Sequence, residues 1–180
     1  MRKLKVTELG RLNIDEYKQT EKVPLIIVLD NIRSIYNVGS VFRTADAFKI
    51  EKIVLCGITA VPPMLEIHKT ALGAEDSVEW TYYEDTLKAI QELKELSYQL
   101  MAIEQVENSL PLHQWTLENE KKYAFILGNE VKGVRQDVVD ACHHSIEIPQ
   151  FGTKHSLNIA NAAAIVMWEF MKQHLSISCP

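Results

Sequence analysis

The run Leu25-Ile26-Ile27-Val28-Leu29 is apolar at every position and limits the choice of fold more than any other stretch of the chain. A strand with one face in water alternates apolar and polar side chains, whereas an uninterrupted apolar strand is typical of a parallel sheet buried on both faces. Further strands are predicted over residues 53–56, 77–82, 99–103, 123–127 and 146–148. Apolar residues at helical spacing lie between them, over residues 37–45, 65–72, 84–96, 135–142 and 157–170. This alternation predicts an α/β fold with a mainly parallel sheet flanked by helices.

The last segment of this pattern has the order strand, polar loop and helix. The strand stops at Pro149, Gly152 allows a tight turn in the loop, and Ser156 is predicted to be the N-cap of the helix. From Leu157 to Phe170 nearly every residue is apolar on all faces, so the helix is either buried in a large core or shared with a partner chain. A polar loop between two buried elements suits a binding site, although the pattern also fits an ordinary crossover.

Composition fits an ordinary globular protein. The 180 residues are 47% hydrophobic and 24% charged, so residues 1–180 are predicted to form one domain, with residues 1–22 as a short appendage. In this appendage Asn13 and Glu16 have the spacing of a helical capping box. No membrane span is expected, because the apolar segment 157–171 contains asparagine and glutamate side chains.

Cysteine and charge patterns narrow the location and the partners. No apolar segment follows the basic N-terminus, so it does not resemble a secretory signal. The 3 cysteines are far apart and form no Cys-x-x-Cys pair, which favours a reduced cytoplasm, and the 6 histidines lack a metal-ligand spacing. The net charge of −5 is unfavourable for nucleic acid, but the acids are concentrated in residues 75–107. A basic face elsewhere is compatible with this distribution.

Polar and glycine residues follow three predicted strands in the second half of the chain. They are Glu104-Gln105, Gly128-Asn129-Glu130, and the loop from Pro149 to His155. Ligands of open parallel sheets bind beyond the carboxyl ends of the strands, so these residues are a candidate site. A ligand could lie against the bare backbone of Gly128, in which case Gly128→Val should weaken binding and leave the fold intact. Alternatively, Gly128 and Gly133 serve turn geometry alone.

A second candidate is the helix that begins near Asn37. Gly39 and Arg43 are one turn apart on it, which would leave an open space beside a guanidinium. Arginine suits a bidentate grip on phosphate or carboxylate. Alternatively, Arg43 forms a surface ion pair with Asp46. The chain has no Gly-rich phosphate loop, no Gly-x-Gly-x-x-Gly fingerprint and no Gly-x-Ser-x-Gly elbow, which disfavours kinases, nicotinamide enzymes and hydrolases.

Three segments taken together resemble a known family. They are Asn37-x-Gly39-x-x-x-Arg43, Leu127-Gly128-Asn129-Glu130-x-x-Gly133, and Ile148-Pro149-x-x-Gly152-x-x-x-Ser156-Leu157-Asn158. Their order and spacing resemble the SpoU-type (TrmH-like) RNA ribose 2′-O-methyltransferases of the SPOUT class, over residues from about Leu25 to Phe170.

The resemblance implies a C-terminal trefoil knot, which periodicity alone would not propose because true knots are rare. It also implies that S-adenosylmethionine is bound in the knot, largely by backbone groups. The implied cofactor-binding residues are Glu104, Gln105, Gly128, Ile148 and Leu157. The functional unit would be a homodimer in which Arg43 of one chain completes the site of the other.

The implied reaction is methyl transfer to a ribose 2′-hydroxyl of tRNA or rRNA. Because a guanidinium holds its proton firmly, we expect Arg43 to grip the phosphate or hydroxyl and to stabilise developing negative charge. Asn37, Glu130, Ser156 and Asn158 would fix Arg43, the loops and the substrate ribose.

The chain also departs from the family pattern. Ala160 stands where many relatives have serine, and only residues 1–22 precede the first strand, so we expect the catalytic domain itself to read the RNA. The alternatives are a non-catalytic RNA-binding protein on the same fold and a small-molecule α/β enzyme that uses the same crevice.

Overall fold

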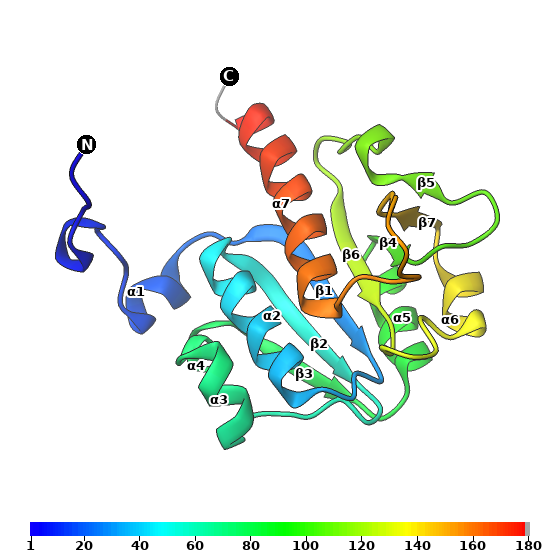
Figure 1. Ribbon diagram of the computed structural model, residues 1–180, viewed down its shortest axis with the longest axis horizontal. Helices are drawn as coiled ribbons and strands as arrows, with labels where there is room; N and C mark the ends of the chain where they lie inside the picture. Colours follow the sequence, from blue (N-terminus) through cyan, green and yellow to red (C-terminus); the bar gives the residue numbers. More distant parts are fainter. Residues whose placement is uncertain (179–180) are drawn as a thin grey trace.

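The computed structural model describes residues 1–178 and contains one seven-stranded sheet with the order β3-β2-β1-β6-β4-β7-β5 (Figure 1). Every pair of neighbouring strands is parallel, which confirms the predicted parallel sheet. The strands are β1 (Val23–Asp30), β2 (Ile50–Cys56), β3 (Trp80–Tyr83), β4 (Tyr98–Ile103), β5 (Leu110–Pro111), β6 (Lys122–Leu127) and β7 (His144–Glu147).

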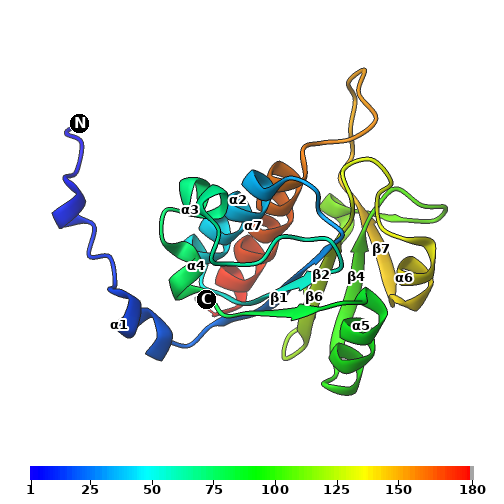
Figure 2. The same cartoon turned by 90° about the horizontal axis from the view of Figure 1, so that it is seen from below.

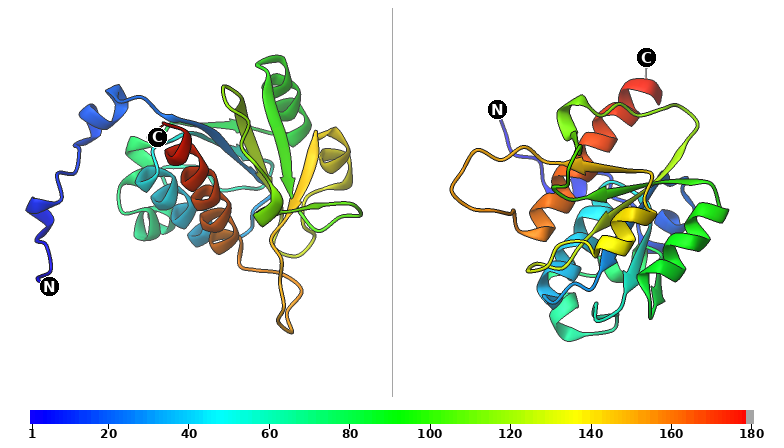
Figure 3. Two further views of the ribbon diagram at one scale, coloured as in Figure 1. Left: turned by 90° about the horizontal axis from the view of Figure 1, so that it is seen from above. Right: turned by 90° about the vertical axis from the view of Figure 1, so that its right-hand side faces the viewer.

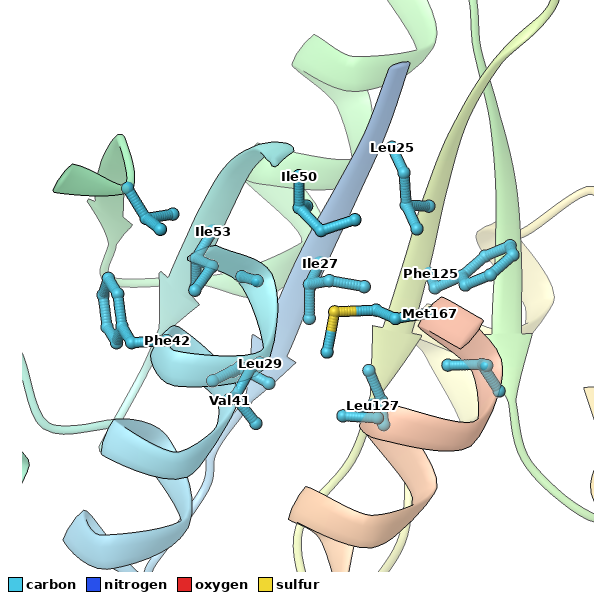
Figure 4. Close-up of a cluster of buried hydrophobic side chains, with 14 of the residues drawn as sticks. Leu25, Ile27, Leu29, Val41, Phe42, Ile50, Ile53, Phe125, Leu127 and Met167 are labelled. Atoms are coloured by element: carbon cyan, nitrogen blue, oxygen red, sulfur yellow. The ribbon is translucent and has the colours of Figure 1, made fainter. Parts of the chain in front are cut away.

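The central strand β1 is buried on both faces, as its apolar run predicts. Leu25, Ile27 and Leu29 point into one hydrophobic core, which Figure 4 shows in part. Ile26 and Val28 point into a second core on the opposite face of the sheet. None of these side chains is more than 3% exposed. The sheet therefore lies between two apolar layers, and the carboxyl ends of its strands share one edge of the molecule.

Helices cover both faces of the sheet (Figures 1 and 2). The first core receives side chains from α1 (Ile14–Gln19), α2 (Ile35–Ala47), α3 (Leu65–Ala71), α4 (Ala74–Ser77) and α7 (Ile159–Ser178). The second core receives them from α5 (Thr86–Glu95) and α6 (Gln136–Ala141). The short 3₁₀ helices η1 (Val6–Glu8) and η2 (Leu112–Gln114) complete the secondary structure. The predicted helical layers on a parallel sheet are confirmed.

The long helix α7 buries only part of its apolar surface in one chain. Ala163, Val166 and Phe170 are fully buried against the sheet. Ile165 and Trp168 are exposed, and the Trp168 ring lies 6.0 Å from the ring of Phe48, the residue after α2. The apolar side chains that α7 leaves exposed thus extend towards the neighbouring helix α2, which lies beside α7 in Figure 1.

The N-terminal segment runs away from the body of the sheet (Figures 2 and 3). Its helix α1 begins at the predicted capping box, in which the Asn13 side chain accepts from the Glu16 amide and the Glu16 carboxylate accepts from the Asn13 amide. Both halves of the box are present, so the predicted cap is confirmed.

Several element boundaries differ from the expectation. Ser77 ends α4 instead of starting a strand, because its hydroxyl donates to the Ala74 carbonyl and the Asp46 carboxylate. The short strand β5 was not predicted, because a strand of two residues is too short to show a recognisable sequence pattern. Ser156 does not cap α7. Asn158 does so instead, because its Oδ1 accepts from the amides of Ala160 and Asn161.

None of the described helices combines the length and the apolar character that a membrane crossing needs. Within residues 1–178, no group of three His, Cys, Asp or Glu side chains has the arrangement of metal ligands. The trefoil knot stays a prediction.

Candidate active site

A cavity of about 330 Å³ lies at the carboxyl ends of β4, β6 and β7. Ligand sites of open parallel sheets are found at this edge. The cavity is lined by all five residues predicted to bind the cofactor, namely Glu104, Gln105, Gly128, Ile148 and Leu157. Glu130 and Ser156 also line it, whereas Asn37, Asn158 and Arg43 do not. Three loops thus contribute to one hollow, as the positions of the polar strand ends indicate.

The loop after β6 is closed by its own asparagine. Asn129 and Gly133 exchange both backbone hydrogen bonds, and the Asn129 side-chain oxygen accepts from the amides of Val131 and Lys132. The Asn129 side-chain amide donates to the carbonyl of Asn31, in the loop after β1, at 2.7 Å. One side chain therefore shapes the loop and ties it to a neighbouring loop.

Glu104 holds the same loop from the opposite side. Its carboxylate accepts from the amide of Val134 at 2.9 Å and from the amide of Gln105 at 3.0 Å. Gly133 has a φ of +69°, and an added Cβ would collide with the Glu104 carboxylate. The Glu104 side chain thus supports the cavity wall through backbone amides.

The structure corrects the expectation for Gly128. A Cβ on this residue would lie within 3.0 Å of the backbone of Gly133 and Val134. The absent side chain therefore lets the returning loop pack on β6, while the backbone of Gly128 lines the cavity. The prediction that Gly128→Val leaves the fold intact is wrong, because the substitution must displace the loop.

Glu130 joins this loop to the start of α2. Its carboxylate accepts from the amides of Arg33 and Ser34 at 2.9 and 3.0 Å and from the Asn37 side chain at 3.1 Å. Burial alone would raise the pKa of Glu130, but these hydrogen bonds outweigh it, and the pKa lies below its usual range. The carboxylate is therefore ionised at neutral pH and lies at the positive end of the α2 dipole.

The network continues to the third segment through Asn37. The Asn158 side-chain amide donates to the Asn37 side-chain oxygen at 3.2 Å. Since Asn37 donates to Glu130, three of the five predicted catalytic residues form one chain of hydrogen bonds that joins two loops to the first turn of α2. Ser156 is exposed at the cavity rim, and Gln105 reaches the His155 carbonyl in the same loop at 3.4 Å.

Arg43 lies outside this network. It is six residues beyond Asn37 on α2, or about 9 Å along the helix axis, and its side chain is exposed. Among residues 1–178, no acid lies within 4.0 Å of its guanidinium, and Asp46 instead accepts from the Ser77 hydroxyl. The proposed Arg43–Asp46 ion pair is therefore wrong.

The expected open space beside Arg43 is also absent. Helix α3 fills the space at Gly39, where an added Cβ would meet the Thr70 hydroxyl and the Ile67 carbonyl. Gly39 thus permits close packing of α2 on α3. The pattern of one helix could not show this, because the neighbour lies about thirty residues along the chain.

Sequence reasoning missed Asn31 and the structural roles of the Asn129 side chain and the Glu104 carboxylate. Asn129 stands inside the second of the three family-like segments, so its position was visible but its two roles were not. The Asn31 carbonyl accepts from a side chain 98 residues away and the Glu104 carboxylate accepts from an amide 30 residues away, and no local pattern reports such pairs.

Solved structures place this architecture in a known class. The A. aeolicus TrmH/SpoU tRNA modifying enzyme superposes with a TM-score of 0.81 over 92% of this chain and 82% of that one, at 21% identity. An AdoMet-bound rRNA methyltransferase from Sinorhizobium meliloti superposes with a TM-score of 0.77 over 88% of this chain and 60% of that one, at 26% identity. The fold is that of the SpoU/TrmH methyltransferases.

Similarity in sequence defines the family. Residues 24–168 match the model of the SpoU rRNA Methylase family, and the chain belongs to that family. The 23S rRNA (guanosine-2′-O-)-methyltransferase RlmB of Nitrosomonas europaea is 31% identical over 150 residues, which are 83% of this chain and 56% of that protein. RlmB of Bordetella pertussis is 27% identical over 163 residues, 90% of this chain and 65% of that protein. The chain therefore spans less than two thirds of the length of these relatives.

Proposed function

We propose that this protein transfers a methyl group from S-adenosylmethionine to a ribose 2′-hydroxyl of tRNA or rRNA. The observation that carries the proposal is the cavity at the ends of β4, β6 and β7, which lies within the matched family region and is lined by residues of the second and third family-like segments. Asn37 of the first segment is hydrogen-bonded to Glu130 and Asn158 of the other two. The names of the similar proteins support the reaction type and the cofactor.

The residues around the cavity suit S-adenosylmethionine. Its volume of about 330 Å³ is in the range of small-molecule sites. Ile103, Leu127 and Ile159 give it apolar walls, and Gln105 and Gln150 supply polar groups at its lining. Backbone segments at Gly128, Ile148 and Leu157 would hold the cofactor. When bound there, S-adenosylmethionine supplies a methyl group on a sulfonium centre that is open to in-line attack.

The chain's own residues would organise the acceptor. The hydrogen-bonded chain of Glu130, Asn37 and Asn158 fixes the loops that flank the cavity, so the ribose would meet a preorganised site. Ser156, which lines the cavity, would contact that ribose. Arg43 would bind the phosphate or the hydroxyl and stabilise the negative charge that develops on the attacking oxygen as the hydroxyl loses its proton to water.

We propose a homodimer because Arg43 is exposed and does not line its own cavity. Ile165 and Trp168 leave an apolar surface on α7, next to the helix that carries Arg43. A second chain packed on this surface would bury the two side chains and bring its Arg43 towards the cavity of the first. The assignment of residues 1–180 to one domain and the cytoplasmic location stay predictions.

Two measurements test the proposed function. Calorimetric titration should show one S-adenosylmethionine site per chain. Incubation with tRNA and rRNA from a strain that lacks this gene should add 2′-O-methyl groups at defined nucleotides. Binding of RNA without any methyl transfer would favour the non-catalytic alternative, and a failure to bind both RNA and S-adenosylmethionine would favour a small-molecule enzyme.

A further inference from the structure

One exposed aromatic side chain has no role in the site described so far. Phe151 is 97% exposed, and it lies in the loop between β7 and α7. This loop projects beyond the sheet, as Figures 2 and 3 show most clearly. An exposed phenyl ring is unfavourable, because its burial would lower the free energy. Its position therefore suggests a partner that covers it.

The neighbours of Phe151 indicate the chemistry of that partner. Gln150 and His155, in the same loop, line the cavity, and Lys154 between them is exposed. The facing loop contributes Val131, which is 72% exposed, and Lys132, and both line the cavity as well. Two apolar and two lysine side chains thus belong to the loops at the entrance, which we call the cavity mouth (residues 131–132 and 150–155).

Three acids, Glu104, Glu130 and Glu147, line the cavity beside these cations, and the first two are hydrogen-bonded to backbone amides. Glu130 directs its carboxylate to the amides of Arg33 and Ser34, and Glu104 directs its carboxylate to those of Val134 and Gln105. Both carboxylates therefore point at backbone donors of the protein. Glu147 also lines the cavity, at the end of β7.

We propose that Phe151 is a stacking platform for an unpaired base of the RNA, beside the nucleotide whose ribose enters the cavity mouth, and that Lys154 contacts the adjoining phosphate. This inference rests on the proposed function. Aromatic rings that stack on bases, together with cations that follow the backbone, are how proteins bind single-stranded nucleic acid. The bases of a duplex are already stacked on one another, so the platform selects a looped or single-stranded target.

The test uses binding and catalysis together. The probe is a fluorescent single-stranded RNA 12-mer of mixed sequence, compared with a duplex of the same length. Phe151→Ala and Phe151→Leu should each weaken single-strand binding about tenfold, because leucine keeps the apolar bulk but has no π-face. Phe151→Tyr should bind like the wild type, and duplex binding should change little. Leu65→Ala removes an apolar side chain that is 65% exposed on α3 and should have no effect.

Three further readouts distinguish base stacking from a role of the ring in folding, cofactor binding or assembly. S-adenosylmethionine affinity, thermal stability and the sedimentation coefficient of Phe151→Ala should match the wild type, while the KM for RNA rises about tenfold. Equal single-strand affinity of Phe151→Leu and the wild type would overturn the proposal. Loss of the dimer in Phe151→Ala would instead identify the ring as a subunit contact and would equally overturn it. If the wild type methylates RNA while Phe151→Ala keeps its KM, this inference fails and the proposed function stands; if the wild type transfers no methyl group, the proposed function fails first.

Discussion

Arg43 combines an exposed guanidinium with a position where no acid of the described chain pairs with it. A surface arginine of this kind contributes little to stability, at most about 1 kcal/mol. Arg43→Ala should therefore leave the melting temperature and S-adenosylmethionine affinity unchanged and lower methyl transfer about a hundredfold. Arg43→Lys should restore little, because an ammonium lacks the planar fork. Lys88→Ala, an exposed cation on α5, is the control, and an Arg43→Ala enzyme as fast as this control would contradict the catalytic assignment.

The Glu130 carboxylate makes part of the stability depend on pH. Its folded-state pKa lies below the ordinary value near 4.5, so its contribution is complete above that value and is lost as the pH falls through the folded-state pKa. Glu130→Gln should lower the free energy of unfolding at pH 7 by about 1–2 kcal/mol, since a neutral amide accepts more weakly and offers one acceptor fewer.

Urea denaturation at pH 7 and at about pH 3.5 checks this expectation. The difference between the wild type and Glu130→Gln should shrink at the lower pH, where the wild-type carboxyl is increasingly protonated. Glu107→Gln, a change at an exposed position, is the matched control. A difference that stays constant across this range would show that the charge of Glu130 does not stabilise the loops.

The loop after β6 and the loop before α7 each contain a glycine of the family-like segments, and the structure predicts opposite outcomes for them. Gly128→Ala should destabilise the protein by about 1–3 kcal/mol and weaken cofactor binding, because its Cβ would displace the backbone of residues 133–134. Gly152→Ala should be nearly neutral, because a Cβ added there would meet no atom within 4 Å. Thermal unfolding measures the stability of the two variants, and calorimetry measures their affinity for the cofactor. Equal melting temperatures would contradict the packing role of Gly128.

The elements of the central sheet could be predicted because their signals are local. The uninterrupted apolar run of β1 and the capping box of α1 each lie within a few neighbouring residues. The sequence pattern wrongly indicated open space beside Gly39, because the atoms that fill this space belong to another helix. At Gly128 the returning loop at residues 133–134 fills the space, which a linear pattern does not show. Ser156 and Asn158 are both good N-caps, and only the path of the loop decides that Asn158 performs the role.

At the scale of the whole molecule, the exposed apolar surface formed by Ile165 and Trp168 allows a test of the proposed homodimer. We expect a dimer at micromolar concentration, and Trp168→Glu should shift it towards the monomer because a carboxylate would be buried in the interface. Trp168 is 53% exposed in one chain, so this substitution should leave the fold of the subunit intact. Sedimentation velocity measures the shift, with Leu65→Ala as the control. A wild-type monomer would contradict the proposed dimer.

Mixing two inactive variants tests whether Arg43 acts across the dimer. Leu157→Trp should fill the cavity of its own chain while remaining folded, since Leu157 is 38% exposed. A heterodimer of Arg43→Ala and Leu157→Trp should then regain one working site, with the cavity from the first chain and Arg43 from the second. No activity in the mixture beyond that of the separate variants would place Arg43 in the site of its own chain.

The pairing of β1 with β6 at the centre of the sheet has a kinetic consequence. The hydrogen bonds that complete the site join residues 31–37 to residues 129–130, and the Glu130–Arg33 bond spans 97 positions of sequence. Such contacts raise the contact order, because a long stretch of chain must be closed before they form. We therefore expect slow refolding in which the helices and the β1–β2 pair appear early. The binding site should be among the last parts to become protected from hydrogen exchange.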